Sequence, residues 1–172
     1  MPIVSLALEH ETAFREFLAD FAAAGETRIP AMLTTTDRPQ AEIVGTLDAW
    51  SRGEQLPAGW VPNTTRFLME GGRFLGVSNL RHRLTDALIE HGGHVGYSVR
   101  PSARGQGHAT RLLMAAKTAA RGLGIDRMLV TCDRDNLASA RVIEKCGGAL
   151  WQEGLYEPLG VVVRRYWIPL DR

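Results

Sequence analysis

Residues Arg104–Thr110 (Arg-Gly-Gln-Gly-His-Ala-Thr) make a glycine-rich turn whose residue types suit the binding of a phosphate group. Gly105 and Gly107 let the backbone turn without the steric penalty of a Cβ atom. From Ala109 onward apolar residues recur at helical spacing, so the turn stands at the N-terminus of a helix. The unpaired amide N–H groups and the dipole at such an end, together with the Arg104 guanidinium, favour a phosphate or pyrophosphate.

Two familiar phosphate-binding motifs are excluded by the residues of this turn. No Gly-Lys-Ser/Thr follows it, as the phosphate loop of nucleoside triphosphatases requires. Thr110 stands where the third glycine of a dinucleotide-binding G-x-G-x-x-G motif belongs. On this pattern alone, a purely structural strand-to-helix turn remains the alternative to a phosphate site.

The elements that position the turn are two strands and the helix between them. The run His94–Val99 alternates apolar with small or polar residues, which predicts a strand, and Pro101 ends it because proline has no N–H to donate. Residues Arg127–Cys132 form a second, buried strand candidate. Because a helix joins the two strands, we expect them to run parallel with a right-handed crossover.

The remaining elements follow from hydrophobic spacing and from the positions of glycine and proline. Together they predict an α/β fold with a mixed central β-sheet and helices on both of its faces, in one domain over residues 1–172. We expect helices at Glu9–Ala24, Ala41–Arg52, Arg83–His91 and Asn136–Cys146, the last with Asn136 as N-cap. We expect a hairpin of Thr64–Glu70 and Arg73–Leu80 and final strands at Ala149–Glu153 and Val161–Ile168. Thr34–Pro39 should form a turn and Gly53–Pro62 a loop.

Composition limits the classes of partner. The formal charge of +1 over 172 residues gives no reason to expect nucleic acid or a membrane surface as a partner. We find neither a leader-like N-terminal segment nor a long apolar run, so we expect a cytoplasmic protein. Cys132 and Cys146 then read as reduced thiols, and the spacing of His91 and His94 without a Cys-x-x-Cys partner predicts no metal site.

Two motifs resemble those of one enzyme family. The pattern Arg104-x-x-Gly107-x-Ala109 after a strand resembles the acyl-CoA signature of the GNAT superfamily of N-acetyltransferases. The segment from Asn136 to Gly147, with Glu-Lys-Cys before its glycine, resembles the family helix that begins with Asn and ends in Glu-Lys-x-Gly. The resemblance covers roughly residues 64–170, and residues 1–60 match only as a helical lead-in.

The resemblance implies a site for acetyl-CoA as cosubstrate. Backbone groups of Tyr97 and Val99 would pair with the pantetheine arm as if it were a further strand. The amides of the glycine-rich turn would hold the pyrophosphate, and Asn136 would reach the coenzyme from the next helix. The expected coenzyme-binding residues are Tyr97, Val99, Arg104, Gly105, Gln106, Gly107, His108, Ala109, Thr110 and Asn136.

The resemblance also implies direct attack of an amine on the thioester carbonyl, with no covalent enzyme intermediate. The amide of Val99 is our candidate for stabilising the oxyanion. Many members carry a tyrosine seven residues after the Asn to protonate the leaving sulfur, but Ile143 stands there in this sequence. Tyr156 and Tyr166, on the last segments of the chain, are candidate replacements, and the alternative for each is a core or rim aromatic. A water molecule is the other candidate for this proton. For the general base we name His94, whose alternative is a hydrogen-bonded buried histidine, and then Glu70, whose alternative is a turn carboxylate.

The predicted function is therefore an acetyl-CoA-dependent N-acetyltransferase that acts on the amine of a small molecule. The absence of the usual tyrosine leaves open a catalytically silent acyl-CoA-binding regulatory module. A peptide or protein N-acetyltransferase is the other alternative, and it would need an open, extended groove. Many GNAT members form dimers, which leaves a homodimer open for this chain.

Overall fold

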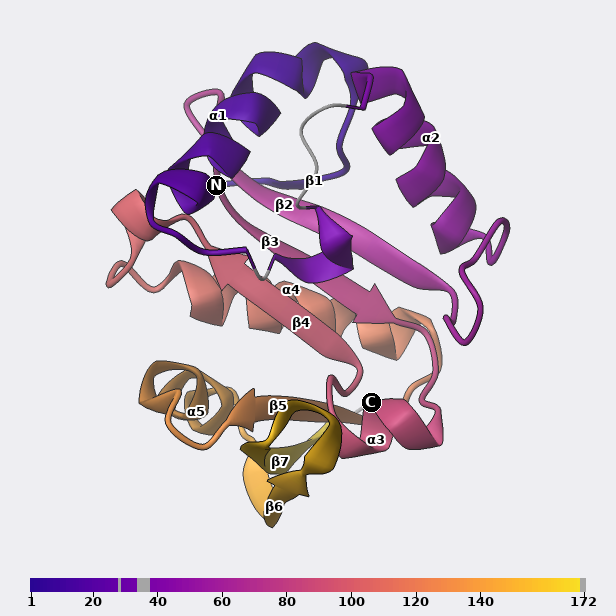
Figure 1. Cartoon of the computed structure of the whole chain (residues 1–172), viewed down its shortest axis with the longest axis vertical. Helices are drawn as coiled ribbons and strands as arrows, with labels where there is room; N and C mark the ends of the chain where they lie inside the picture. Colours follow the sequence, from indigo (N-terminus) through magenta and orange to yellow (C-terminus); the bar gives the residue numbers. More distant parts are fainter. Residues whose placement is uncertain (28, 34–37, 171–172) are drawn as a thin grey trace.

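Strands form two antiparallel sheets in the computed structural model, which describes residues 1–27, 29–33 and 38–170 (Figure 1). The first sheet has the order β1-β2-β3-β4 and the second has the order β5-β7-β6. The strand bounds are β1 Ile3–Val4, β2 Asn63–Glu70, β3 Arg73–Arg81, β4 Val95–Val99, β5 Arg127–Asp133, β6 Ala149–Tyr156 and β7 Val161–Pro169.

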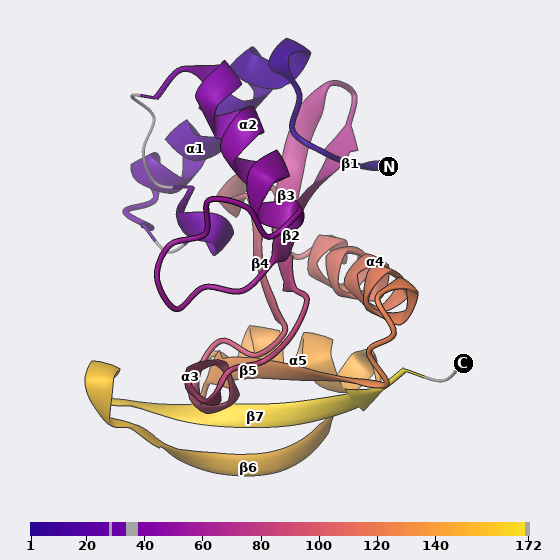
Figure 2. The ribbon, with the colours of Figure 1, turned by 90° about the vertical axis from the view of Figure 1, so that its right-hand side faces the viewer.

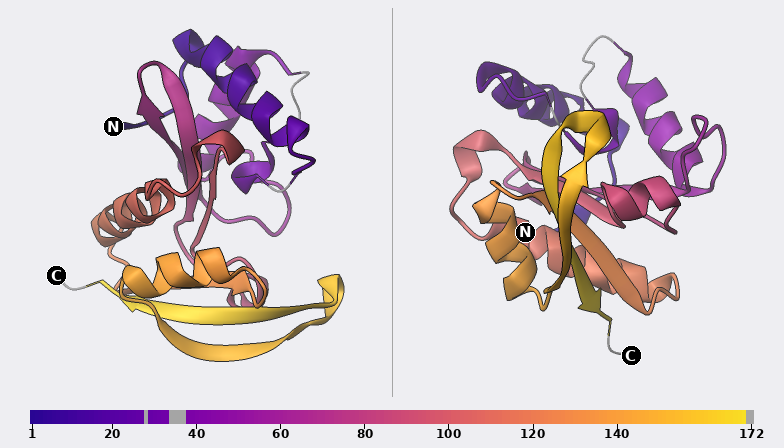
Figure 3. Two further views of the ribbon diagram at one scale, coloured as in Figure 1. Left: turned by 90° about the vertical axis from the view of Figure 1, so that its left-hand side faces the viewer. Right: turned by 60° about the horizontal axis from the view of Figure 1, so that its bottom comes forward.

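Helices cover both faces of the first sheet, as Figures 2 and 3 show. Helices α1 (Glu11–Ala23) and α2 (Gln40–Ser51) lie on one face, and α4 (His108–Gly122) lies on the other. Helix α5 (Leu137–Lys145) packs against α4 and β5, and the short α3 (Asp86–Glu90) connects β3 to β4. The predicted α/β fold with helices on both faces is confirmed.

An aromatic cluster holds α1 on the sheet. The phenylalanines of α1 fall at helical spacing and are buried, as the sequence predicted. Phe17 meets Phe67 of β2 and Phe74 of β3 edge to face, with ring centroids 6.0 and 6.3 Å apart. Each fully buried phenylalanine contributes about 2–3 kcal/mol of hydrophobic stabilisation. The cluster therefore holds α1 against β2 and β3.

A second core joins the two sheets through α4. Leu113 and Ala116 of α4 pack in one cluster with Met128 and Val130 of β5 and with Ile143 of α5. The small side chain of Ala116 lets the helix approach the strands closely. Since α4 touches both sheets, it sets the angle between them.

The two strands that α4 connects do not share a sheet. β4 and β5 belong to different sheets, and no ladder joins them in the part of the chain that the structure describes. They meet near His94 and Leu129 and then diverge, which leaves an edge of each strand unpaired. The sequence predicted one mixed central sheet in which these two strands run parallel, whereas the described strands form two sheets with antiparallel pairings. A connecting helix does not specify whether the strands that it joins are hydrogen-bonded to the same sheet.

Smaller differences concern short elements. The β2–β3 hairpin is confirmed, and Gly71 and Gly72 both have positive φ, at 54° and 77°, as a tight hairpin turn of this kind requires. β1 was not predicted because two residues carry no periodicity. The predicted turn at 34–39 lies largely outside the described residues. No helix in the described part of the chain is long and apolar enough to cross a bilayer.

Candidate active site

The vertex between the two sheets is built by His94. Its amide N–H donates to the Leu129 carbonyl at 2.7 Å, and its ring Nδ1 accepts from the Leu129 N–H at 2.9 Å. Gly93 beside it has φ +61°, and a Cβ there would lie 2.5 Å from the Leu129 carbonyl oxygen, so only glycine fits. Past this point no ladder joins the facing edges of β4 and β5 in the described residues.

The open edge of β4 is formed by its odd-numbered residues. The His94 carbonyl accepts from the Arg81 N–H, and the Arg100 N–H donates to the Leu75 carbonyl, so the even-numbered residues bond to β3. Because successive residues of a strand direct their backbone groups to opposite edges, Tyr97 and Val99 direct theirs to the gap. The Val99 carbonyl accepts from Nε of Arg104 at 3.2 Å. Tyr97 and Val99 therefore direct their backbone groups into the gap, and the Val99 carbonyl is engaged there by a side chain.

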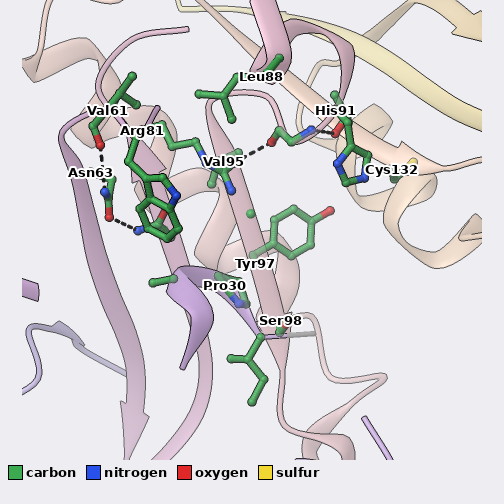
Figure 4. Close-up of a pocket in the computed structure, with 18 of the residues that line it drawn as sticks. Pro30, Val61, Asn63, Arg81, Leu88, His91, Val95, Tyr97, Ser98 and Cys132 are labelled. Atoms are coloured by element: carbon green, nitrogen blue, oxygen red, sulfur yellow. Dashed lines mark hydrogen bonds between the residues drawn. The ribbon is translucent and has the colours of Figure 1, made fainter. Parts of the chain in front are cut away.

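A cavity of about 710 Å³ occupies the divergence of the two sheets. One half faces α5 and is lined by Cys132, Asn136 and Ser139 around the Tyr97 ring. The other half lies on the α1–α2 face of the first sheet, where Pro30 and Trp60 form its walls. Figure 4 displays Arg81, Asn63 and Tyr97 around this space. Two molecules, one bound in each half, would therefore meet at the open edge of β4.

The half near α5 carries the Tyr97 phenol together with the side chains of Ser139, Cys132 and Asn136. Tyr97 Oη is hydrogen-bonded to Ser139 Oγ at 2.8 Å, and burial raises the pKa of Tyr97 to about 12 although that bond acts against the rise. Burial likewise raises the pKa of Cys132 to about 11, so its thiol is protonated at neutral pH and is a poor nucleophile. Asn136 caps α5 as predicted, since its side-chain oxygen accepts from the Ser139 N–H at 3.0 Å.

The glycine-rich turn adopts backbone angles that favour glycine. Gly105 and Gly107 have φ of 78° and 80°, and Gly107 directly precedes α4. The Arg104 amide donates to the Pro101 carbonyl and the Arg111 amide to the Gly107 carbonyl, while the amides of residues 105–110 have no carbonyl partner among the described residues. The turn does not line the cavity but follows the end of β4.

Arg104 and His108, two residues of this turn that the resemblance assigned to the coenzyme, are engaged or buried within the protein. Arg104 forms a two-pronged ion pair with Glu26, at 2.7 and 2.6 Å, and the hydrogen bond to Arg104 lowers the pKa of Glu26. His108 is buried at the start of α4, and its Nδ1 has no partner among the described residues. Arg104 must therefore leave or share Glu26 to reach a phosphate.

The half of the cavity on the α1–α2 face is polar and ordered. Asn79 of β3 donates to Asn63 Oδ1 at 2.7 Å and to Thr65 Oγ1 at 3.1 Å, and Asn63 donates in turn to the Val61 carbonyl at 2.9 Å. Nη1 of Arg81 donates to the carbonyls of Gly92 and Gly93 at 2.8 and 3.1 Å. Trp60 lies against Trp50, with ring centroids 4.9 Å apart.

Three of the candidate catalytic side chains, His94, Glu70 and Tyr166, do not line the cavity. Nδ1 of His94 already accepts a hydrogen bond, and burial, followed by the charge of Arg81, lowers the pKa of His94 to about 4. Glu70 lies at the hairpin turn, seven residues along β2 from Asn63 and therefore about 23 Å away. Tyr166 is buried at 1% exposure with its hydroxyl 3.4 Å from Glu144. The geometry favours other residues for proton transfer.

The resemblance implied a coenzyme-binding role for Asn136, which does line the cavity, but no catalytic role was predicted for three other groups that line it. Arg81, His91 and the hydroxyl of Tyr97 are among its lining groups. The hairpin register supplied a usable signal, because Asn63 faces Arg81 across the two strands and Asn79 lies two residues earlier on the same face. No group of three or more histidine, cysteine or acidic side chains in the described residues is arranged to hold a metal.

Comparison with known proteins decides the family. The family model of the acetyltransferase (GNAT) domain matches residues 5–149. The chain belongs to the GNAT acetyltransferase family. A search of curated protein sequences found no match.

Solved structures of GNAT acetyltransferases share the fold. The putative acetyltransferase yncA from Salmonella typhimurium with its cofactor acetyl-CoA is 20% identical, with a TM-score of 0.63 over 99% of this chain and 94% of that one. RimL, a ribosomal L7/L12 α-N-protein acetyltransferase in complex with coenzyme A, is 18% identical, with a TM-score of 0.70 over 98% and 94%. The microcin C7 self-immunity acetyltransferase MccE with acetyl-CoA and AMP is 13% identical, with a TM-score of 0.67 over 97% and 91%.

Proposed function

We propose that this GNAT acetyltransferase transfers the acetyl group of acetyl-CoA to the amine of a small molecule. One observation carries the proposal: the open edge of β4 at Tyr97 and Val99 leads directly into the glycine-rich turn and the N-terminus of α4. An extended amide-bearing chain that ends in a pyrophosphate matches this run of backbone donors and acceptors. The coenzymes bound in the yncA, RimL and MccE structures support the same ligand here.

The coenzyme lies along β4 in this proposal. Its pyrophosphate accepts from the amides of residues 105–110, the Thr110 hydroxyl and the Arg104 guanidinium. Its pantetheine arm pairs with Tyr97 and Val99, and Asn136 approaches it from the start of α5. Val99 is close to the turn and therefore serves the phosphate-proximal part of the arm. The thioester lies further toward the vertex, so the amide of Tyr97 is a better oxyanion donor than that of Val99.

The acceptor amine enters from the α1–α2 face and attacks the thioester carbonyl. The new C–N bond forms as a tetrahedral oxyanion, which the Tyr97 amide stabilises. Collapse of that intermediate breaks the C–S bond, and the Tyr97 hydroxyl donates a proton to the leaving sulfur in place of the tyrosine that Ile143 replaces. His91, whose imidazole lines the cavity, accepts the proton that the amine loses.

A small acceptor fits the walls of the cavity better than a peptide does. Pro30 and Ala31 precede α2, Trp60 and Val61 precede β2, and together they flank the acceptor half. An extended peptide needs a groove that is open at both ends. The RimL comparison keeps a protein N-terminus as the second candidate, since RimL acts on a ribosomal protein.

The test separates these functions by activity and by binding. The purified chain is incubated with acetyl-CoA and with panels of small amines and of short peptides, and free CoA thiol is followed. We expect release that depends on a small amine, together with calorimetric binding of CoA. Binding without release on any amine would support the silent module instead. Release with peptides alone would support the second candidate, and absence of CoA binding would refute the whole proposal.

A further inference from the structure

We propose that Arg81 binds a carboxylate on the acceptor, next to its reacting amine, so that the substrates are amines of the amino-acid type. The inference rests on the proposed function, because it names the acceptor class of the same site. Arg81 is the last residue of β3 and lines the α1–α2 half of the cavity. The acceptor half thus contains a fixed positive charge.

One nitrogen of the Arg81 guanidinium donates hydrogen bonds within the protein, and the other two are available to a ligand. Nη1 donates to the carbonyls of Gly92 and Gly93, which fixes the plane of the group. Nε and Nη2 have no acceptor among the described residues, and neither atom is sealed from solvent. These two nitrogens form one edge of a planar fork, the geometry that pairs with both oxygens of a carboxylate.

Arg81 differs from Arg100 and Arg165, the two most buried arginines among the described residues. Arg100 lies 2.6 Å from a carboxylate oxygen of Asp20, and Arg165 lies 3.9 Å from one of Glu90. Over residues 1–27, 29–33 and 38–170, no carboxylate oxygen lies within the 4.0 Å limit of an ion pair around Arg81. A largely desolvated cation without a counter-ion is costly, and an anionic ligand removes that cost. Consistently, burial lowers the pKa of Arg81.

The position of Arg81 sets how far the carboxylate lies from the amine. A Cβ atom at Gly96 would lie 3.7 Å from Nη2 of Arg81, so this nitrogen is beside β4. Gly96 directly precedes Tyr97, whose amide faces the thioester in the proposed function. Neighbouring residues of a strand are about 3.3 Å apart. The carboxylate and the amine are therefore only a few bonds apart, as in α- and β-amino acids.

The glycine at position 96 also leaves the space that such a ligand needs. The nearest atoms to a Cβ there are Nη2 of Arg81 and two side-chain carbons of Pro30. Asn63 and Asn79 line the same half, and their mutual hydrogen bond holds them in place. The acceptor is thus bounded by Arg81, the asparagine pair and Pro30.

The test compares matched acceptors that differ only in the carboxylate. The twenty L-amino acids are assayed beside their α-carboxamides, and glycine is also assayed beside aminomethylphosphonate to distinguish a carboxylate from a phosphonate. We expect kcat/KM for the preferred acid to exceed that for its amide by at least about 100-fold, because a site built for a polar group rejects the analogue that lacks it. Arg81→Gln should lower kcat/KM for the acid by about 100-fold and leave that for the amide nearly unchanged. Arg83→Gln, at an exposed position two residues away, is the matched control and should change neither.

Several outcomes would overturn the inference. It is overturned if the wild type uses acid and amide equally well, uses no carboxylate-bearing amine, or prefers the phosphonate. It is also overturned if Arg81→Gln lowers kcat/KM equally for the acid and for the amide. If that variant does not fold, the wild-type comparison decides alone. Calorimetry with CoA keeps the two proposals apart: a chain that binds CoA and acetylates only uncharged amines refutes this inference and leaves the proposed function in place.

Discussion

The Leu129 amide donates to the His94 ring at 2.9 Å, and the His94 amide donates back to the Leu129 carbonyl at 2.7 Å. A side-chain nitrogen thus takes the place of a backbone acceptor in what would be the next step of a ladder. The ladder stops there, and β4 and β5 diverge to form the cavity. His94 is therefore a structural residue of the vertex in this arrangement.

Replacing His94 by phenylalanine should destabilise the fold. The Leu129 N–H would lose its acceptor inside the protein, at a cost of about 1–3 kcal/mol. We expect this loss in urea denaturation at pH 8. An unchanged unfolding midpoint would contradict the structural role of His94.

The wild type should also lose stability as the pH falls from 6.5 to 4, because the pKa of His94 is lowered from 6.5 to about 4 in the folded chain. In that window the unfolded chain binds a proton that the folded chain excludes. The loss is roughly 3 kcal/mol at about 1.4 kcal/mol per pKa unit, and it levels off below pH 4. The His94→Phe variant should lack this dependence, which is measured as unfolding free energy against pH.

Glu26→Gln should strengthen coenzyme binding. The carboxylate of Glu26 holds the Arg104 guanidinium and opposes the negative charge of a pyrophosphate. Because the pair is exposed, the expected gain is small, about two- to fivefold in Kd or below 1 kcal/mol. Calorimetry with CoA at two salt concentrations measures it, and the gain should shrink at high salt. Glu42→Gln on α2 is the control, and equal gains in both variants would count against a local effect.

Gly107→Val should weaken CoA binding by about 2–4 kcal/mol, through backbone strain and one or two lost charge-assisted hydrogen bonds. The φ of 80° is one that valine rarely adopts, although the space around its Cβ position is open. The expected effect therefore comes from conformation and not from a clash. Gly122→Ala, at the last residue of α4, where the space around a Cβ atom is also open, is the control for folding. An unchanged affinity in Gly107→Val would remove the turn from the coenzyme site.

Tyr97→Phe should lower kcat about 10–100-fold, the lower part of the range for general acid catalysis, with little change in KM for acetyl-CoA. The backbone that pairs with the arm is unaltered, and only the hydroxyl is removed. Ser139→Ala removes the partner at 2.8 Å and should have a smaller effect on kcat. A Tyr97→Phe variant with wild-type kcat would assign the sulfur proton to water.

Local patterns predicted the elements well, and long-range contacts decided the roles of the side chains. The phenylalanine spacing of α1, the two glycines of the hairpin and the Asn136 cap are each readable from a few neighbouring residues, and the structure has them nearly as expected. The interpretation of His94 as a base rested on its position at the start of a strand. Its actual partner, Leu129, is 35 residues away, and no local pattern specifies that contact. Arg81 is a similar case, because its environment is set by Gly92, Gly93 and Gly96 from beyond α3.

The ion pair between Arg100 and Asp20 gives a further prediction, about how α1 is attached to the end of β4. Nε of Arg100 lies 2.6 Å from Asp20, Ser102 Oγ lies 2.5 Å from the same carboxylate oxygen, and Arg100 is only 5% exposed. Asp20→Asn leaves that buried cation without its counter-ion, so we expect a loss of about 3 kcal/mol in urea denaturation at pH 7. Hydrogen bonds from Ser102 and Arg100 lower the pKa of Asp20 below its ordinary value. The stabilisation is therefore complete above the ordinary value of about 4 and disappears as the pH falls through the lower folded value. The difference in unfolding free energy between wild type and variant should therefore become smaller at acid pH. A difference that stays constant from pH 7 to pH 2.5 would contradict a role for the Asp20 charge.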